Sequence, residues 1–135
     1  MVKMDITNIQ FPDNFFDSII CNHVLEEIID DRKAMSELYR TLKAGRWAIL
    51  QVPLSLSLEK TYEDFSITST AGREKAFGLR ENVRIYAKDY KDRLERTGFE
   101  VDTFKWVTES ENFGGRRNRF GLIEEECLFL ANKRL

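Results

Sequence analysis

The chain contains two short runs of apolar residues that do not alternate with polar ones. The first follows Asp17 and stops at two polar side chains, Asn22 and His23. The second covers residues 46–53 and stops at Pro53, which cannot donate a ladder hydrogen bond. Continuous apolar runs are typical of strands buried on both faces of a parallel sheet. We therefore predict core strands at residues 18–22 and 47–52.

The segment between these strands has the spacing of an amphipathic helix, which we place at residues 31–43. Asp30 or Asp31 can cap its start, and Gly45 stands where a left-handed C-terminal cap belongs. Apolar residues recur at intervals of three and four: Met35, Leu38, Tyr39 and Leu42. Strand, helix and strand within about 35 residues predict a βαβ unit with a right-handed crossover.

Residues 54–86 lose this periodicity and are predicted to form a long excursion, with one short helix near Ala71 to Phe77 that Gly78 ends. Long loops of this kind are commonly functional lids, and the aromatic residues in this one argue against disorder. A second amphipathic helix is predicted at residues 88–97. The strands expected at 99–107 and 126–133 have no helix pattern between them, so we expect an antiparallel hairpin.

The composition predicts a globular protein with one domain spanning residues 1–135, because 42% of the 135 residues are hydrophobic and 12% are aromatic. The 21 basic and 23 acidic residues nearly cancel, which implies neither a nucleic-acid partner nor a membrane surface. The apolar runs are far below the roughly 20 residues of a membrane span, and we see no signal segment. We therefore expect a cytoplasmic protein.

The two cysteines, Cys21 and Cys127, lie inside strand-like runs and lack the spacing of a metal site. No metal site is therefore predicted. Both cysteines are expected to be buried, reduced thiols.

Residues 5–53, "DITNIQFPDNFFDSIICNHVLEEIIDDRKAMSELYRTLKAGRWAILQVP", resemble part of a class I S-adenosylmethionine-dependent methyltransferase of the type 11 group. That family shows an Asp, a Pro-Phe-like turn, Phe-Asp, an apolar strand, a polar break, Val-Leu-Glu-His, a helix ending in Leu-Lys-Pro-Gly-Gly, and a further strand. The similarity extends to residues 77–101 and the closing hairpin. It implies an α/β fold with a partial Rossmann-like sheet, mostly parallel, with a C-terminal antiparallel hairpin and helices on both faces.

The resemblance also implies a cofactor, S-adenosyl-L-methionine, and a small-molecule substrate. By similarity, Asn22 and His23 would lie by the methionine end of the cofactor, and Asp5 with the backbone of Ile6 by the adenine edge. The alternative is that Asp5 is a solvated turn residue and that His23 merely enters the next helix. Glu26 and Glu27 are interpreted as acids favoured by a helix dipole.

The excursion follows a strand end and is expected to cover the substrate. Candidate substrate contacts there are Tyr62, Glu63, Asp64 and Arg84, and candidate catalytic residues are His23 and Tyr86. Arginines such as Arg84 could hold an anionic substrate, although surface arginines are more often simply solvated.

Three departures from the family pattern stand out. Glu26-Glu27 replaces Glu-His, and Ala44-Gly45-Arg46 replaces Pro-Gly-Gly, so Arg46 would be strained by about 1 kcal/mol if positive φ is needed there. The third departure is that the glycine-rich loop, which follows the first strand in the family, has no counterpart in this sequence. The chain has no glycine before Gly45. The chain is thus interpreted as a truncated, C-terminal, substrate-side portion of the domain, lacking about two βα units.

Without those units the strand at 18–22 would be an exposed sheet edge. We expect either a homodimer that covers this edge, with residues 2–7 folding into the vacant position, or a complementary N-terminal half. Three functions are compared: a methyltransferase or its substrate-side part, a non-catalytic remnant that does not bind cofactor alone, and a phosphate- or nucleic-acid-binding module using "GGRRNR" (114–119). The last is disfavoured because the overall charge is not basic.

Overall fold

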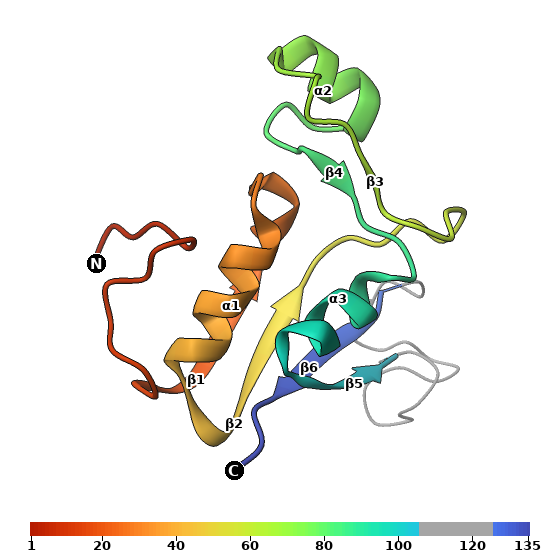
Figure 1. Cartoon of the computed structure of the whole chain (residues 1–135). Helices are drawn as coiled ribbons and strands as arrows, with labels where there is room; N and C mark the ends of the chain where they lie inside the picture. The colour runs from red at the N-terminus through yellow and green to blue at the C-terminus, as the bar shows by residue number, and fades with distance from the viewer. Residues whose placement is uncertain (106–125) are drawn as a thin grey trace.

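The main sheet has four strands in the order β1-β2-β6-β5 (Figure 1). Our computed structural model of the chain describes residues 1–105 and 126–135. The sheet strands are β1 (Phe16–Asn22), β2 (Leu42–Gln51), β5 (Glu100–Phe104) and β6 (Leu128–Asn132). The helices are α1 (Asp31–Thr41), α2 (Thr70–Phe77), α3 (Tyr90–Thr97) and the short 3-10 helix η1 (Leu25–Glu27).

The predicted βαβ unit is confirmed. β1 and β2 are parallel, with Ser18 opposite Trp47 and Asn22 opposite Gln51, and α1 connects them. Asp30 is the residue that caps α1: its Oδ1 accepts a hydrogen bond of 3.0 Å from the Lys33 backbone N–H. α1 ends at Thr41, two residues before its predicted end, because the chain becomes extended at Leu42.

Gly45 lies within β2 rather than at the end of α1, which corrects the predicted cap. Its φ is +74°, and its N–H donates to the Lys133 carbonyl at 2.7 Å. The register shifts at this end of the ladder, so that Leu42 faces Phe16 and Trp47 faces Ser18. Arg46 is not among the residues with positive φ, so the glycine carries the irregularity and the strain considered for Arg46 does not arise.

Replacing Gly45 by Ala is expected to lower the free energy of unfolding by about 1 kcal/mol. The new Cβ would occupy a left-handed backbone and would lie 2.9 Å from Leu135 Cδ2. Urea denaturation measures the change. Gly78→Ala is the matched control, because Gly78 has φ +92° but a Cβ added there would meet nothing within 4 Å. An equal or smaller loss for Gly45→Ala would contradict the Leu135 contact.

The C-terminal hairpin is confirmed, but the sheet is not mostly parallel. β6 runs antiparallel to both β2 and β5, and only the β1–β2 pair in this sheet is parallel. β5 ends at Phe104, and residues 106 and 107 of the predicted strand lie outside the described residues, as does "GGRRNR" (114–119). β1 and β6 flank β2, and both cysteines are free thiols.

The helices that pack on the sheet lie on one face, not on both as the resemblance implied. α1 and α3 lie side by side over it (Figure 1). Alternate strand residues, including Leu50 and Phe129, are buried beneath them. On the strands' other face Ile20 is 65% exposed and Trp47 is 40% exposed, and no helix of the described residues covers this bare face.

The excursion is confirmed as an ordered unit beyond the end of β2. Tyr62–Glu63 (β3) pairs antiparallel with Arg84–Ile85 (β4), and α2 lies between them in the sequence. Ser69 caps α2 through a hydrogen bond from the Gly72 N–H, and Gly78 ends it as predicted. No helix of the described residues has the length and apolar character needed to cross a membrane.

The segment before β1 is tied to α1, and in this single chain residues 2–7 do not pair with β1. The Ile9 N–H donates to Glu37 Oε2 at 2.8 Å, and Arg40 donates to the Ile9 carbonyl at 2.9 Å. In the part of the chain that the structure describes, β1 pairs only with β2 and remains a sheet edge.

Candidate functional site

The candidate site lies at the carboxyl ends of the parallel strands β1 and β2. His23 follows β1 directly, and its N–H donates to the Gln51 carbonyl at 2.8 Å. His23 has φ +53°, a left-handed conformation that a non-glycine residue rarely adopts. Such backbone strain costs on the order of 1 kcal/mol or more and is concentrated at functional sites. The polar end of β1 is thus a left-handed turn immediately before η1.

The imidazole of His23 is held beside a buried acid. His23 Nδ1 lies 3.6 Å from Glu26 Oε1, and Glu26 is only 4% exposed. Burial raises the pKa of Glu26 above its usual value, although its own backbone N–H and His23 partly oppose this. Glu27, its neighbour, is exposed. Treating both as first-turn acids therefore overlooked Glu26, because adjacent residues of a single 3-10 turn face different environments.

A cavity of about 270 Å³ opens at these strand ends. Its lining residues are His23, Gln51, Val52, Pro53, Leu54, Glu126 and Cys127. Gln51 is buried and bridges to β6, since its Nε2 donates to the Cys127 carbonyl at 2.6 Å. Cys21 is buried next to this region, and burial raises the pKa of its thiol to about 11. This thiol is therefore protonated and unreactive at neutral pH.

A second cavity, of about 180 Å³, adjoins the first because Pro53 and Leu54 line both. Glu26, Ser55, Phe77, Asn82, Arg84 and Ile85 complete its lining. The two cavities thus extend from the strand ends into the base of the excursion. This is the side of the sheet where parallel α/β folds bind ligands.

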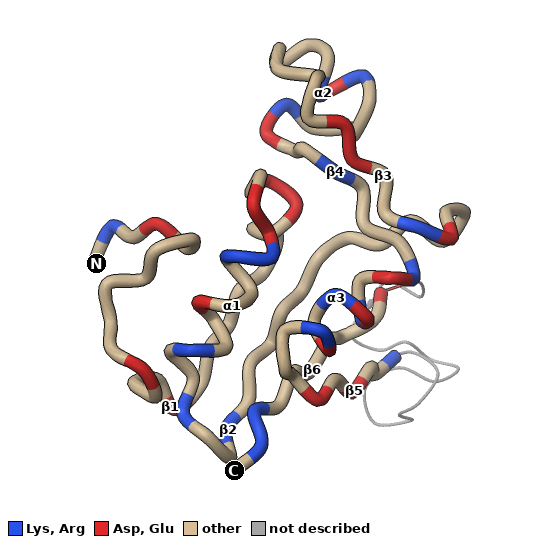
Figure 2. Tube along the Cα trace, viewed as in Figure 1, with Lys and Arg blue, Asp and Glu red and all other residues tan. Residues whose placement is uncertain are grey.

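A larger hollow of about 600 Å³ lies elsewhere, along α1 and α3. Its lining is mostly charged, with both signs represented: Arg32, Ser36, Lys60, Asp89, Asp92, Arg93, Arg96 and Thr97. Figure 2 shows acidic and basic positions interspersed along these helices. We do not assign the site to this hollow, because none of its lining residues lies at the carboxyl ends of β1 and β2.

Replacing Glu26 by Gln is expected to stabilise the fold by about 1 kcal/mol at pH 7, because a buried carboxylate with a free oxygen costs more than an amide. The gain should depend on pH. An acid whose pKa is raised on folding contributes full stability below its unfolded pKa and loses it as pH rises through the folded pKa. The difference between the variant and the wild type should therefore shrink as pH falls towards 4. Thermal melts across this range measure it, and a difference independent of pH would contradict the assignment.

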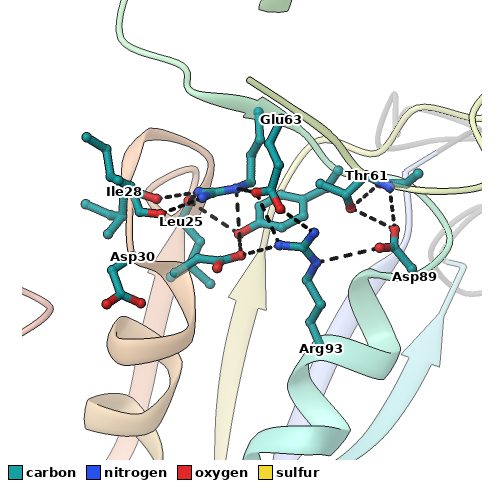
Figure 3. Close-up of polar contacts among 12 residues, drawn as sticks. Leu25, Ile28, Asp30, Thr61, Glu63, Asp89 and Arg93 are labelled. Carbon is teal, nitrogen blue, oxygen red and sulfur yellow. Dashed lines mark hydrogen bonds and ion pairs between the residues drawn. The ribbon is translucent and has the colours of Figure 1, made fainter. Parts of the chain in front are cut away.

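Two of the residues predicted from the excursion, Glu63 and Arg84, form part of a buried polar network (Figure 3). Arg84 is 1% exposed and donates to the carbonyls of Leu25, Ile28 and Ile29. Its Nε also donates to Glu63 Oε2 at 2.9 Å. Each of the three guanidinium nitrogens thus donates to a protein group, and Arg84 fastens the excursion to η1 while also lining the second cavity.

The same network includes Asp31 at the start of α1. Arg93 bridges Asp31 and Glu63, at 2.9 Å to each (Figure 3). Burial opposes ionisation of Glu63, but hydrogen bonds from Arg93 and Arg84 outweigh it and lower the pKa of Glu63. Tyr86 is fully buried and donates to Asp31 Oδ2 at 2.6 Å, and burial raises the pKa of its phenol well above the usual range. Tyr86 is therefore placed as a structural residue and not as a base.

The remaining predicted residues occupy separate places. Tyr62 is 42% exposed and packs near Phe77, with ring centroids 5.5 Å apart. Asp64 accepts hydrogen bonds from Ser66 in its own turn, which lower its pKa. Asp5 does the same with Thr7, through bonds of 2.7 and 2.8 Å. The structure thus brings His23 to the cavity at the strand ends, whereas the cofactor role of Asp5 and Ile6 remains a prediction.

Known proteins resemble this chain in sequence. Residues 1–50 match the sequence profile of the family described as "Methyltransferase domain". Over 120 residues the chain is 30% identical to the ubiquinone/menaquinone biosynthesis C-methyltransferase UbiE of Vibrio cholerae, and 31% identical to that of Pseudoalteromonas translucida. Each alignment covers 79% of this chain. The chain is thus similar to methyltransferases, and the family profile itself matches residues 1–50.

Solved structures show that the fold of this chain is similar to that of known proteins. A putative methyltransferase from Bacillus halodurans superposes with a TM-score of 0.60 at 16% identity, covering 100% of this chain and 78% of that one. The [4+2]-cyclase SpnF superposes with a TM-score of 0.64 at 15% identity, covering 98% and 56%. The fold therefore does not by itself determine the reaction.

The chain spans about half the length of the curated relatives it matches, 46% of the Vibrio cholerae protein and 48% of the Pseudoalteromonas one. Sequence reasoning did not single out Glu26 or Asn82 as candidate site residues, although both line the second cavity. Glu26 stands next to a second acidic residue, Glu27, and Asn82 lies in a stretch without helical or strand periodicity. Neither position carries a local pattern that separates a buried side chain from a solvated one.

Proposed function

We propose that this chain forms the substrate-side part of an S-adenosylmethionine-dependent methyltransferase that acts on a small molecule. The observation that supports this most directly is the left-handed His23 turn at the carboxyl ends of β1 and β2, which borders the first of two adjoining cavities. Sequence identity to C-methyltransferases supports the same reaction class. In such a transfer the protein mainly aligns the acceptor with the sulfonium methyl group and excludes water.

The cofactor would lie at the strand ends, with Asn22 and His23 beside its methionine portion. Asn22 is exposed there, and the His23 side chain is 55% exposed, so both are accessible to a ligand. Asp5 and Ile6 would lie by its adenine. When bound, S-adenosylmethionine supplies the electrophilic methyl group. His23, beside Glu26, is the candidate to accept a proton from the methyl acceptor.

Full cofactor affinity, in this proposal, requires a second segment that contains a glycine-rich loop. Two surfaces support it: the unpaired edge of β1, and the bare face with Ile20 and Trp47. A complementary methyltransferase segment, in the same polypeptide or another, would add a strand to this edge and helices to this face. A homodimer is the competing arrangement. Light scattering during size-exclusion chromatography separates them, because a chain that is monomeric on its own would contradict the homodimer.

Calorimetric titration with S-adenosylmethionine tests the function. We expect weak binding, with a dissociation constant of about 1 mM, since only part of the cofactor surface is contacted. The second candidate is a non-catalytic protein that does not bind the cofactor. It predicts no heat at any cofactor concentration. His23→Ala should abolish the heat of binding if the cofactor binds at the strand ends. The same substitution should leave the heat unchanged if the cofactor binds elsewhere.

A further inference from the structure

Two buried side-chain oxygens have no hydrogen-bond partner among the described residues. They are Glu26 Oε2 and Asn82 Oδ1. Glu26 is 4% exposed and Asn82 is 6% exposed, so bulk water does not satisfy them. Native proteins leave few buried polar atoms unpaired, because each carries the full cost of its lost hydration. Two such acceptors in one place indicate a missing donor.

Both residues line the same cavity of about 180 Å³, next to the strand ends. The rest of its wall is largely apolar, formed by Pro53, Leu54, Phe77 and Ile85. A cavity that combines apolar walls with a few convergent polar atoms is typical of small-molecule sites. Its volume is sufficient for a single ring.

The charge at the cavity selects the kind of donor. Arg84 also lines it, and its guanidinium group is held in place by backbone carbonyls and Glu63. A fixed positive charge disfavours a cationic ligand. A neutral donor is therefore the better match to this cavity.

We propose that this cavity binds the hydroxyl group of a small apolar molecule, which donates to Glu26 and lies within reach of Asn82. The inference rests on the proposed function in one respect: the hydroxyl belongs to the methyl acceptor. Pro53 and Leu54 are shared with the cavity at the strand ends, so an acceptor bound here adjoins the place assigned to the cofactor. Glu26 and Asn82 are then specificity-determining residues.

Titration of the folded chain with phenol and with toluene tests this, followed through the backbone amide signals of Leu54, Ser55 and Ile85 in NMR spectra. The two probes share shape and differ in the hydroxyl. Phenol is expected to bind about tenfold more tightly than toluene, the difference that one hydrogen bond to a buried carboxylate supplies. Glu26→Gln should remove most of this preference, and Asn82→Leu should reduce it.

Glu27→Gln is the matched control, because Glu27 is the exposed neighbour of Glu26 on η1 and should leave the preference unchanged. Equal affinities for the two probes, no perturbation of these amides, or a preference that survives Glu26→Gln would each overturn the proposal. Since no cofactor is present, these results are independent of methyl transfer. If the chain binds phenol in this way but does not bind S-adenosylmethionine, the proposed hydroxyl site is supported and the proposed function is contradicted.

Discussion

Replacing Arg84 by Ala is expected to lower the free energy of unfolding by about 3–5 kcal/mol. Arg84 is 1% exposed and donates to three backbone carbonyls of residues 25–29 as well as to Glu63. Removing it takes this donor from the three carbonyls and leaves the Glu63 carboxylate with Arg93 as its remaining arginine partner. Chemical denaturation followed by circular dichroism measures the loss.

Two variants make the Arg84 result specific. Arg80→Ala removes an exposed arginine that pairs with Glu74 at 3.1 Å, and should change stability by less than about 0.5 kcal/mol. Arg84→Met keeps most of the side-chain volume and removes the donors. If Arg84→Met were as stable as the wild type, packing and not hydrogen bonding would hold the excursion to η1, and the account of the network in Figure 3 would be wrong.

Glu37→Gln should destabilise the chain by about 1–2 kcal/mol at pH 7, after allowance for solvent screening of a partly exposed pair. Glu37 accepts from Arg40 at two oxygens and from the Ile9 N–H. Chiefly through the hydrogen bonds from Arg40, and against the effect of burial, these contacts lower the pKa of Glu37 to about 2. They join the segment before β1 to α1.

The sign of the pH dependence follows from this lowered pKa. Glu37 contributes its full stability above its unfolded pKa of 4.5, and loses it as pH falls through about 2. The difference between Glu37→Gln and the wild type should therefore narrow steadily below pH 4.5. Glu95→Gln serves as the control, because Glu95 belongs to an exposed pair with Lys91 at 3.7 Å. A gap that stays constant down to about pH 2 would refute the role of the charge.

The β1–α1–β2 unit could be predicted because its signals are local. Apolar runs set the strands, and apolar residues at helical spacing set α1. Gly45 shows the limit of that reasoning: its positive φ was expected, but its place in a bulge depends on pairing with β1 and on the Lys133 carbonyl, which lies far along the chain. The parallel order of the sheet was overestimated for the same reason, since the direction of β6 depends on its neighbours.

The polar network was beyond local reasoning altogether. Arg84 and the Leu25 carbonyl are 59 residues apart, and nothing in the letters around Arg84 distinguishes it from the solvated Arg80. His23 was predicted at the site from family resemblance, and its left-handed backbone adds a physical reason for its position. The burial of Glu26 and Asn82 depends on how the excursion folds back onto η1. One contact between them is the hydrogen bond of 2.9 Å that the Val83 N–H donates to the Glu26 carbonyl.

The central claim, that the carboxyl ends of β1 and β2 form the cofactor side of a methyltransferase site, is tested most directly by NMR titration of the ¹⁵N-labelled chain with S-adenosylmethionine. This method detects weak binding and locates it. The account predicts that the amides of Asn22, His23 and residues 51–54 shift in a saturable way, while those at the α1–α3 hollow, such as Arg96, do not. Shifts confined to that hollow, or none anywhere at about 10 mM cofactor, would contradict it.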